Sequence, residues 1–287
     1  GMMIGQSMLT FGSETGYDMF MAVSIIVSFA AIPIMLTAAN SPDFEEPEPA
    51  SFRRVYHNSP LSVVGMAITG FNAAIVFGMG AVFASKLGMS FNQVSYFMVA
   101  IVAGAMILQY PIGKLSDLID RRTVILITHI LSLGFLFASY YASTVSFFWL
   151  GVMMALYGGV STPLYSLYIA HANDYLSPRQ VVGTSAKLVM INGCGAIFGA
   201  PVLGYTIYLI GNSAFFSVQI IMHIIMIAFV FYRMYARESM PVEAQGPYVG
   251  IRGTSVASSL LPEAEWDGRE DEDSTEGEQA DLATQLS

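Results

Sequence analysis

Residues 61–85 read LSVVGMAITGFNAAIVFGMGAVFAS and contain no Asp, Glu, Lys or Arg. A helix of about 20 apolar residues spans the hydrocarbon core of a bilayer, which is about 30 Å thick. Backbone N–H and C=O groups in lipid have to be satisfied within the segment, so a run of this length predicts a helix rather than a strand. Residues 61–85 are therefore predicted to cross a membrane.

Further runs of the same kind occupy most of the chain. One of them is interrupted by Lys187 alone, and the others contain no charged residue. The runs lie at residues 19–38, 91–113, 123–142, 147–172, 181–209 and 214–232. The alternating ten-residue segments typical of a membrane β-barrel are absent. The pattern predicts an all-α membrane protein with seven transmembrane helices.

The composition of the 287-residue chain excludes several functional classes. Hydrophobic residues make up 54% and charged residues 11%, whereas soluble domains carry about 25% charged residues. The net charge of −9 argues against nucleic acid as a partner. The single cysteine, Cys194, excludes a disulfide framework and a multi-cysteine metal site. Because no nucleophile–base or metal-ligand constellation appears, we expect neither an enzyme nor a cofactor.

The basic residues of the loops predict the orientation in the membrane. Only Lys86 falls on one side, and the remaining loop residues fall on the other: Arg53, Arg54, Lys114, Arg121, Arg122, Arg179, Arg233 and Arg237. Cytoplasmic loops carry the excess of Lys and Arg, so residues 40–60 and the C-terminus are predicted to be cytoplasmic. The acidic residues are concentrated in 238–287, which we expect to be a disordered tail.

Residues 40–60 form the longest break between the runs. They contain several prolines and an acidic cluster at 43–48, which we expect to keep the segment extended and solvated. Residues 1–11 are mostly apolar but too short to span and lack the features of a signal peptide. We expect them to be the outer end of a helix whose earlier part is missing.

Residues 113–122, GKLSDLIDRR, connect two of the runs. Gly113 is expected to end the first helix and to allow a sharp turn. Asp117 can accept from backbone N–H groups at a neighbouring helix N-terminus. Arg121 and Arg122 can pair with carboxylates or lipid headgroups. Alternatively the segment is only a positively charged anchor, which explains the arginines but not the spacing of Gly113 and Asp117.

This segment resembles the cytoplasmic-loop motif of the major facilitator superfamily, a glycine, three residues, an aspartate and then a basic pair. Gly113, Asp117, Arg121 and Arg122 match the motif. Leu118 stands where a basic residue is common, and Asp120 where a glycine is common. Four other segments resemble a bacterial branch whose substrates are mostly unassigned: 158–166 (GGVSTPLYS), 170–174 (AHAND), 183–186 (GTSA) and 192–193 (NG).

The resemblance covers about residues 1–237 and implies a domain division. Residues 1–38 would be a remnant of the first bundle, its fifth helix in part and its sixth entire. Residues 39–60 would be the central cytoplasmic loop, 61–237 the complete second six-helix bundle and 238–287 a disordered cytoplasmic tail. In the family the motif's aspartate helps latch the two halves together at the cytoplasmic side.

The resemblance also implies the function. We expect a secondary active transporter that moves a small solute by alternating access in the bacterial inner membrane, of which this chain is an incomplete portion without its N-terminal bundle. The lipid bilayer, the solute and that missing bundle are then its partners. Two alternatives stay open: a seven-helix receptor or sensor, and a non-transporting membrane scaffold. Against the receptor, the predicted spans divide into one, a long linker and six.

Transporters of this type bind their substrate near the middle of the membrane, between two bundles. The polar residues predicted at that depth are Asn72, Tyr157, Ser161, Thr162 and Asn192. The resemblance places the helices of Asn72 and Tyr157 along the central cavity. Alternatively, these side chains only hydrogen-bond neighbouring helices, each stabilising the bundle by about 0.6 kcal/mol.

Lys187 is the only charged residue within a predicted span. An intramembrane charge is a candidate functional residue, but Lys187 lies close enough to the cytoplasmic end to reach the headgroups. His129, His171 and His223 lie apart in the sequence, and we expect them to hydrogen-bond within the bundle. A carboxylate proton relay would have to lie in the missing half, unless histidine takes that role.

Overall fold

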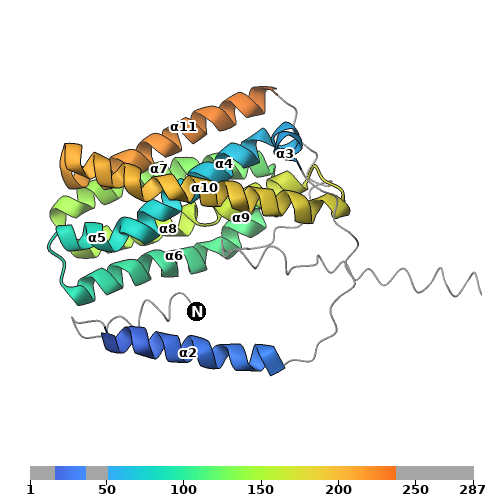
Figure 1. The fold of residues 1–287 in the computed structure, drawn as a ribbon. Helices are drawn as coiled ribbons and strands as arrows, with labels where there is room; N and C mark the ends of the chain where they lie inside the picture. The colour runs from blue at the N-terminus through green and yellow to red at the C-terminus, as the bar shows by residue number, and fades with distance from the viewer. Residues whose placement is uncertain (1–16, 37–50, 237–287) are drawn as a thin grey trace, which may run out of the picture.

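The computed structural model describes residues 17–36 and 51–236, and within these ranges every regular element is a helix (Figure 1). The expectations for residues 1–11, for the acidic cluster at 43–48 and for the tail at 238–287 lie outside the described residues. The first described helix, α2 (Tyr17–Leu36), is mostly apolar, with Asp18 near its start and two serines further along. Its large side chains, such as Tyr17, Met21 and Phe29, are exposed. A mostly apolar helix of this kind is suited to lipid.

The remaining long helices pack into a bundle (Figure 1). In chain order they are α4 (Pro60–Ala73), α5 (Met79–Lys86), α6 (Phe91–Leu118), α7 (Arg121–Val145), α8 (Phe147–Ser161), α9 (Leu164–Asn173), α10 (Pro178–Ile210) and α11 (Ala214–Ala236). Helix α6 packs on α8, α8 on α7, α7 on α11, and α4 on α10. Local sequence features explain where two of these helices begin and end. Ser90 and Gln93 form a capping box at the start of α6, and Gly211, with a φ of +75°, ends α10.

Five helical stretches of the described part are long and apolar enough to cross a membrane. They are Pro60–Lys86, Phe91–Leu118, Arg121–Val145, Phe147–Asn173 and Arg179–Ala236. The last contains α10 and α11, which are joined by the short helical turn η3 (Gly211–Ser213). The five stretches confirm a multi-pass, all-α membrane protein, while the count of seven spans stays a prediction.

Two interruptions inside these stretches were not predicted. The π-helical turn η2 (Ala74–Gly78) separates α4 from α5, and Thr162 and Pro163 separate α8 from α9. Proline has no N–H to donate, so Pro163 removes one hydrogen bond from the helix. Single π-helical turns inside α-helices frequently occur at functional sites. Both interruptions lie within apolar stretches whose hydropathy gives no sign of them.

The prediction that residues 40–60 are extended throughout was wrong for their last part. Residues 52–58 form the helix α3 (Phe52–Asn58), whose N-cap Ser51 accepts a hydrogen bond from the backbone N–H of Arg54 at 3.2 Å. Val55 is buried on the bundle. The cap and the buried apolar contact stabilise a short helix that the prolines upstream do not interrupt.

Helices α4 and α10 approach each other closely because glycines face the partner backbone. A Cβ atom at Gly70 would collide with the carbonyl of Asn192, and one at Gly195 with the carbonyl of Ala67. Gly199 is equally close to the carbonyl of Phe71. Small residues at such positions are the usual means of close helix packing in membranes.

Candidate functional site

The cytoplasmic motif differs from its prediction at Gly113. Helix α6 continues through Gly113 to Leu118, so the glycine lies inside the helix and does not form the turn. A helical glycine costs only about 1 kcal/mol relative to alanine, which the surrounding bundle offsets. The turn falls at Ile119 and Asp120, and the Asp120 carboxylate accepts from the backbone N–H of Arg122 at 2.9 Å, capping α7.

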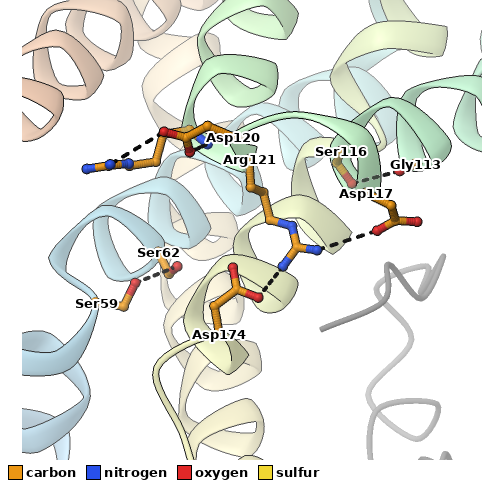
Figure 2. A network of polar contacts seen from close by, with 9 residues as sticks. Ser59, Ser62, Gly113, Ser116, Asp117, Asp120, Arg121 and Asp174 are labelled. Carbon is orange, nitrogen blue, oxygen red and sulfur yellow. Dashed lines mark hydrogen bonds and ion pairs between the residues drawn. The ribbon is translucent and has the colours of Figure 1, made fainter. Parts of the chain in front are cut away.

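Arg121 is the centre of the motif's ion pairs. Its side chain is only 1% exposed and reaches between two carboxylates, as Figure 2 shows. Its Nη1 donates to Oδ1 of Asp174, and its Nη2 lies 3.5 Å from Oδ1 of Asp117. The expectation that Arg121 pairs with carboxylates is thus confirmed. The guanidinium joins the end of α6, the start of α7 and the end of α9.

The second arginine and several hydroxyls complete the polar layer at this end of the bundle. Arg122 is buried, and its Nη2 lies 3.4 Å from Oδ2 of Asp120. Ser116 donates to the carbonyl of Gly113 at 2.7 Å, and Ser59 donates to Ser62 at 2.8 Å (Figure 2). Sequence reasoning missed Asp174 as the buried partner of Arg121. The only sequence signal for Asp174 was its position just after the apolar run at 147–172.

Asn72 and Asn192, both predicted to bind substrate, have different surroundings. Asn192 on α10 donates through Nδ2 to the carbonyl of Met66 on α4 at 3.0 Å, so it joins two helices. Asn72 lies at the end of α4, directly before η2, and is 7% exposed. Its Oδ1 has no hydrogen-bond partner within the described part of the chain. An unpaired buried acceptor costs about 1–3 kcal/mol, so Asn72 is the candidate with spare hydrogen-bonding capacity.

Ser161 and Thr162 lie at the break between α8 and α9, where both side chains are half-buried. Tyr157, one turn earlier, is fully buried, and its hydroxyl donates to Oε1 of Gln219 on α11 at 2.8 Å. The structure therefore directs Tyr157 into the bundle interior. Ser161 and Thr162 are therefore partly accessible, whereas Tyr157 is not.

The Tyr157 hydroxyl belongs to a chain of buried polar side chains in the bundle interior. It lies 3.3 Å from Nε2 of His223, and Nδ1 of His223 lies 2.7 Å from Nδ1 of His129. Nε2 of His129 lies 2.6 Å from the hydroxyl of Tyr168 on α9. The expectation that His129 and His223 hydrogen-bond within the bundle is confirmed. Their direct contact was missed because they lie on α7 and α11, far apart in the sequence.

Lys187 on α10 lies beside α3. Its Nζ lies 4.8 Å from the ring centroid of Phe52 on α3, a cation–π distance. The side chain is half-buried. This position is the one that a lysine reaching for the membrane surface would take.

An apolar groove of about 640 Å³ lies between α6 and α8. Its walls include Phe97, Gly104, Ile107 and Val152, and Gln93 is one of its few polar residues. The groove is not lined by any of the five polar residues Asn72, Tyr157, Ser161, Thr162 and Asn192. These five residues and the apolar groove therefore lie in different parts of the bundle.

Comparison with known proteins identifies the group to which the chain is similar. The model of the Major Facilitator Superfamily matches residues 61–266. An uncharacterized MFS-type transporter of Bacillus subtilis, YfkF, is 29% identical over 158 residues, which are 54% of this chain and 39% of YfkF. An uncharacterized MFS-type transporter of Yersinia pestis is 24% identical over 255 residues, 88% of this chain and 63% of that protein. The aligned part of the chain thus spans less than two thirds of the length of either relative.

Proposed function

The chain belongs to the Major Facilitator Superfamily, and from that premise we propose that it forms part of a secondary active transporter that moves a small solute by alternating access. The match favours a membrane transporter over the seven-helix receptor considered above. In the proposed topology the protein lies in the bacterial inner membrane with seven spans and a cytoplasmic C-terminus. Residues 61–237 are the second bundle, 39–60 the central loop, 1–38 belong to the first bundle, and 238–287 form the tail.

One observation carries the proposal: two apolar, membrane-length stretches are each interrupted, and polar side chains lie beside the interruptions. Asn72 precedes η2, while Ser161 and Thr162 lie at the break between α8 and α9. Interrupted helices near the middle of the membrane are typical of the solute sites of transporters. Helices α4 and α9, which flank these interruptions, pack against each other.

We assign Asn72, Ser161 and Thr162 to the solute site. The unpartnered Oδ1 of Asn72 can accept a hydrogen bond from the solute, and the two hydroxyls can donate or accept. We assign Asn192 and Tyr157 a structural role beside the site, because their polar groups already form hydrogen bonds to α4 and α11. Since the assigned site carries no formal charge, it is suited to an uncharged polar solute.

The cytoplasmic motif has a separate proposed role. Asp117 is 38% exposed, and its Oδ1 lies 3.5 Å from Nη2 of Arg121. We assign Asp117 to the latch between the two bundles and Arg121 to holding Asp117 in position.

The experiment that tests the function uses the complete gene that contains this chain. Cells that express it are compared with deletion cells for accumulation of a panel of radiolabelled uncharged solutes. The proposal expects at least one solute whose accumulation changes, and expects Asn72→Ala and Thr162→Ala to reduce that change strongly. A transported solute whose flux is unaffected by both substitutions would overturn the assigned site.

A further inference from the structure

The buried chain Tyr168–His129–His223–Tyr157–Gln219 connects four helices through consecutive hydrogen bonds. All five side chains are at most 1% exposed. The transport proposal uses only Tyr157 among them, and only as a support. Two directly bonded imidazoles inside a membrane bundle are unusual, because polar groups at this depth are costly unless they serve a function.

The last member of the chain fixes the direction of every hydrogen bond. Nε2 of Gln219 donates to the carbonyl of Phe215 at 2.7 Å, so Oε1 faces Tyr157 and accepts from its hydroxyl. The phenol oxygen can then accept from an Nε2–H on His223. Nδ1 of His223 is left as an acceptor for an Nδ1–H of His129, whose Nε2 accepts from Tyr168. In this neutral state, each hydroxyl and ring N–H has an acceptor.

A second state with one additional proton keeps the contacts of the four imidazole nitrogens. The proton is added to Nε2 of His129, which becomes a donor to the Tyr168 oxygen once the phenol O–H rotates away. Nε2–H of His223 still donates to Tyr157. The two Nδ1 atoms, 2.7 Å apart, share the one hydrogen between them. A separation of 2.7 Å accommodates one hydrogen and not two, so the pair takes up one proton.

We infer that His129 and His223 form a proton-binding site in the interior of the bundle, which accepts and releases one proton per chain. The two states differ by a single proton and by the rotation of one hydroxyl. The positive charge of the protonated pair is divided between two rings and is stabilised by two phenol oxygens. Because both states keep the contacts of all four imidazole nitrogens, neither requires the helices to separate.

The groups that face His129 and His223 favour a pair that binds and releases a proton over a pair that stays protonated. They are Tyr168 from α9 and Tyr157 from α8, neither of which is a carboxylate. Helix α4, which packs on α9 and α11, has no titratable side chain. Among the described residues of this region, the nearest charged group along α7 is Arg122, about 10 Å from His129 at 1.5 Å per residue, and it contacts Asp120. One residue further along lies Arg121. That arginine is already paired with Asp117 and Asp174.

The site also has a connection to the proposed solute site. Tyr157 accepts from His223 and lies one helical turn before Ser161 on α8. If the proposed function holds, a change in protonation reaches the solute site through α8. The proton-binding site itself does not depend on that proposal.

The test is nitrogen NMR of the full chain in lipid nanodiscs with 15N-labelled histidine, recorded over a series of pH values. His57→Gln and His171→Gln serve to assign the four histidines. We expect His129 and His223 to change at one common midpoint and to take up one proton together, with a coupling between the two Nδ1 atoms in the protonated state. Uptake of two protons, two separate midpoints, or no change down to the pH of unfolding would overturn the inference.

His223→Gln provides a second arm of the same test. Without its partner ring, His129 loses the shared proton, so its signal no longer changes at the common midpoint. A His129 signal that changes at an unaltered midpoint in His223→Gln would show that the rings bind protons independently. No solute enters either measurement, so a negative result leaves the transport proposal standing.

Discussion

Arg121 donates to Asp174, a residue 53 positions later in the chain, and both side chains are almost completely buried. This contact joins the start of α7 to the end of α9 at one end of the bundle. Asp117 contacts the same guanidinium from α6 but is partly exposed. The two carboxylates therefore differ in burial, and we expect the buried one to contribute more to stability.

Asp174→Asn is predicted to destabilise the bundle more than Asp117→Asn. Removing one partner of a buried ion pair costs about 3–5 kcal/mol, and we expect the lower end because Asp117 remains. A partly exposed pair contributes about 1 kcal/mol or less. Reversible unfolding in mixed micelles measures both variants. Equal losses of the free energy of unfolding would contradict the assigned roles.

Gly193 and Gly195 on α10 provide a matched pair for the packing of α4 on α10. A Cβ at Gly195 would collide with the carbonyl of Ala67, whereas a Cβ at Gly193 meets open space. Gly193→Ala should leave stability unchanged or raise it by up to about 1 kcal/mol through helix propensity. Gly195→Ala should lower stability by about 1–3 kcal/mol through overpacking. The same unfolding measurement distinguishes them, and a stabilising Gly195→Ala would show that the helices do not approach closely.

Asn72→Ala and Asn192→Ala are predicted to act on different properties. Asn192 loses its bond to the Met66 carbonyl, which should lower stability by about 0.6 kcal/mol. Asn72 loses no described hydrogen bond at Oδ1, so the stability of Asn72→Ala should not fall. Solute transport should fall about tenfold, which corresponds to about 1.4 kcal/mol. Transport by the complete protein and unfolding are measured in parallel. A loss of stability in Asn72→Ala together with a loss of transport in Asn192→Ala would instead assign the solute contact to Asn192.

Lys187 is predicted to be dispensable for transport. Its Nζ lies over the Phe52 ring at the predicted cytoplasmic end, so Lys187→Arg and Lys187→Ala should both transport at the rate of the parent. The comparison is made in the complete protein with a solute identified by the accumulation screen. A large loss in Lys187→Ala that Lys187→Arg restores would instead place the charge in the solute pathway.

The apolar runs predicted the helices well because lipid demands long uncharged segments. The run at 91–113 begins at the observed start of α6, and the run at 214–232 at that of α11. The predicted end at Gly113 was five residues early, because a lysine and an aspartate were taken to mark a loop, although the helix continues to Leu118. The interruptions at η2 and at Pro163 leave the hydropathy almost unchanged, so no run could reveal them.

The candidate site was only partly accessible from the sequence. The motif correctly identified Arg121 as a residue that pairs with carboxylates, and depth alone selected Asn72 and Thr162. The partners of these residues depend on tertiary packing: Asp174 reaches Arg121 and His223 reaches His129 only when distant helices meet. Asn192 was selected by the same criterion of depth, yet it binds a neighbouring helix, which only its surroundings reveal.

The most direct test of the transporter uses a single cysteine at the break between α8 and α9. Thr162→Cys is made in the complete protein in a Cys194→Ser background, which removes this chain's one native thiol, with Ser139→Cys, a buried position on α7, as the control. Membrane-impermeant alkylation should modify Cys at position 162 from either side of the membrane, more slowly when transported solute is present, and should leave the control unmodified. Protection of position 162 from both sides, or labelling that the solute does not change, would contradict a solute pathway at this break.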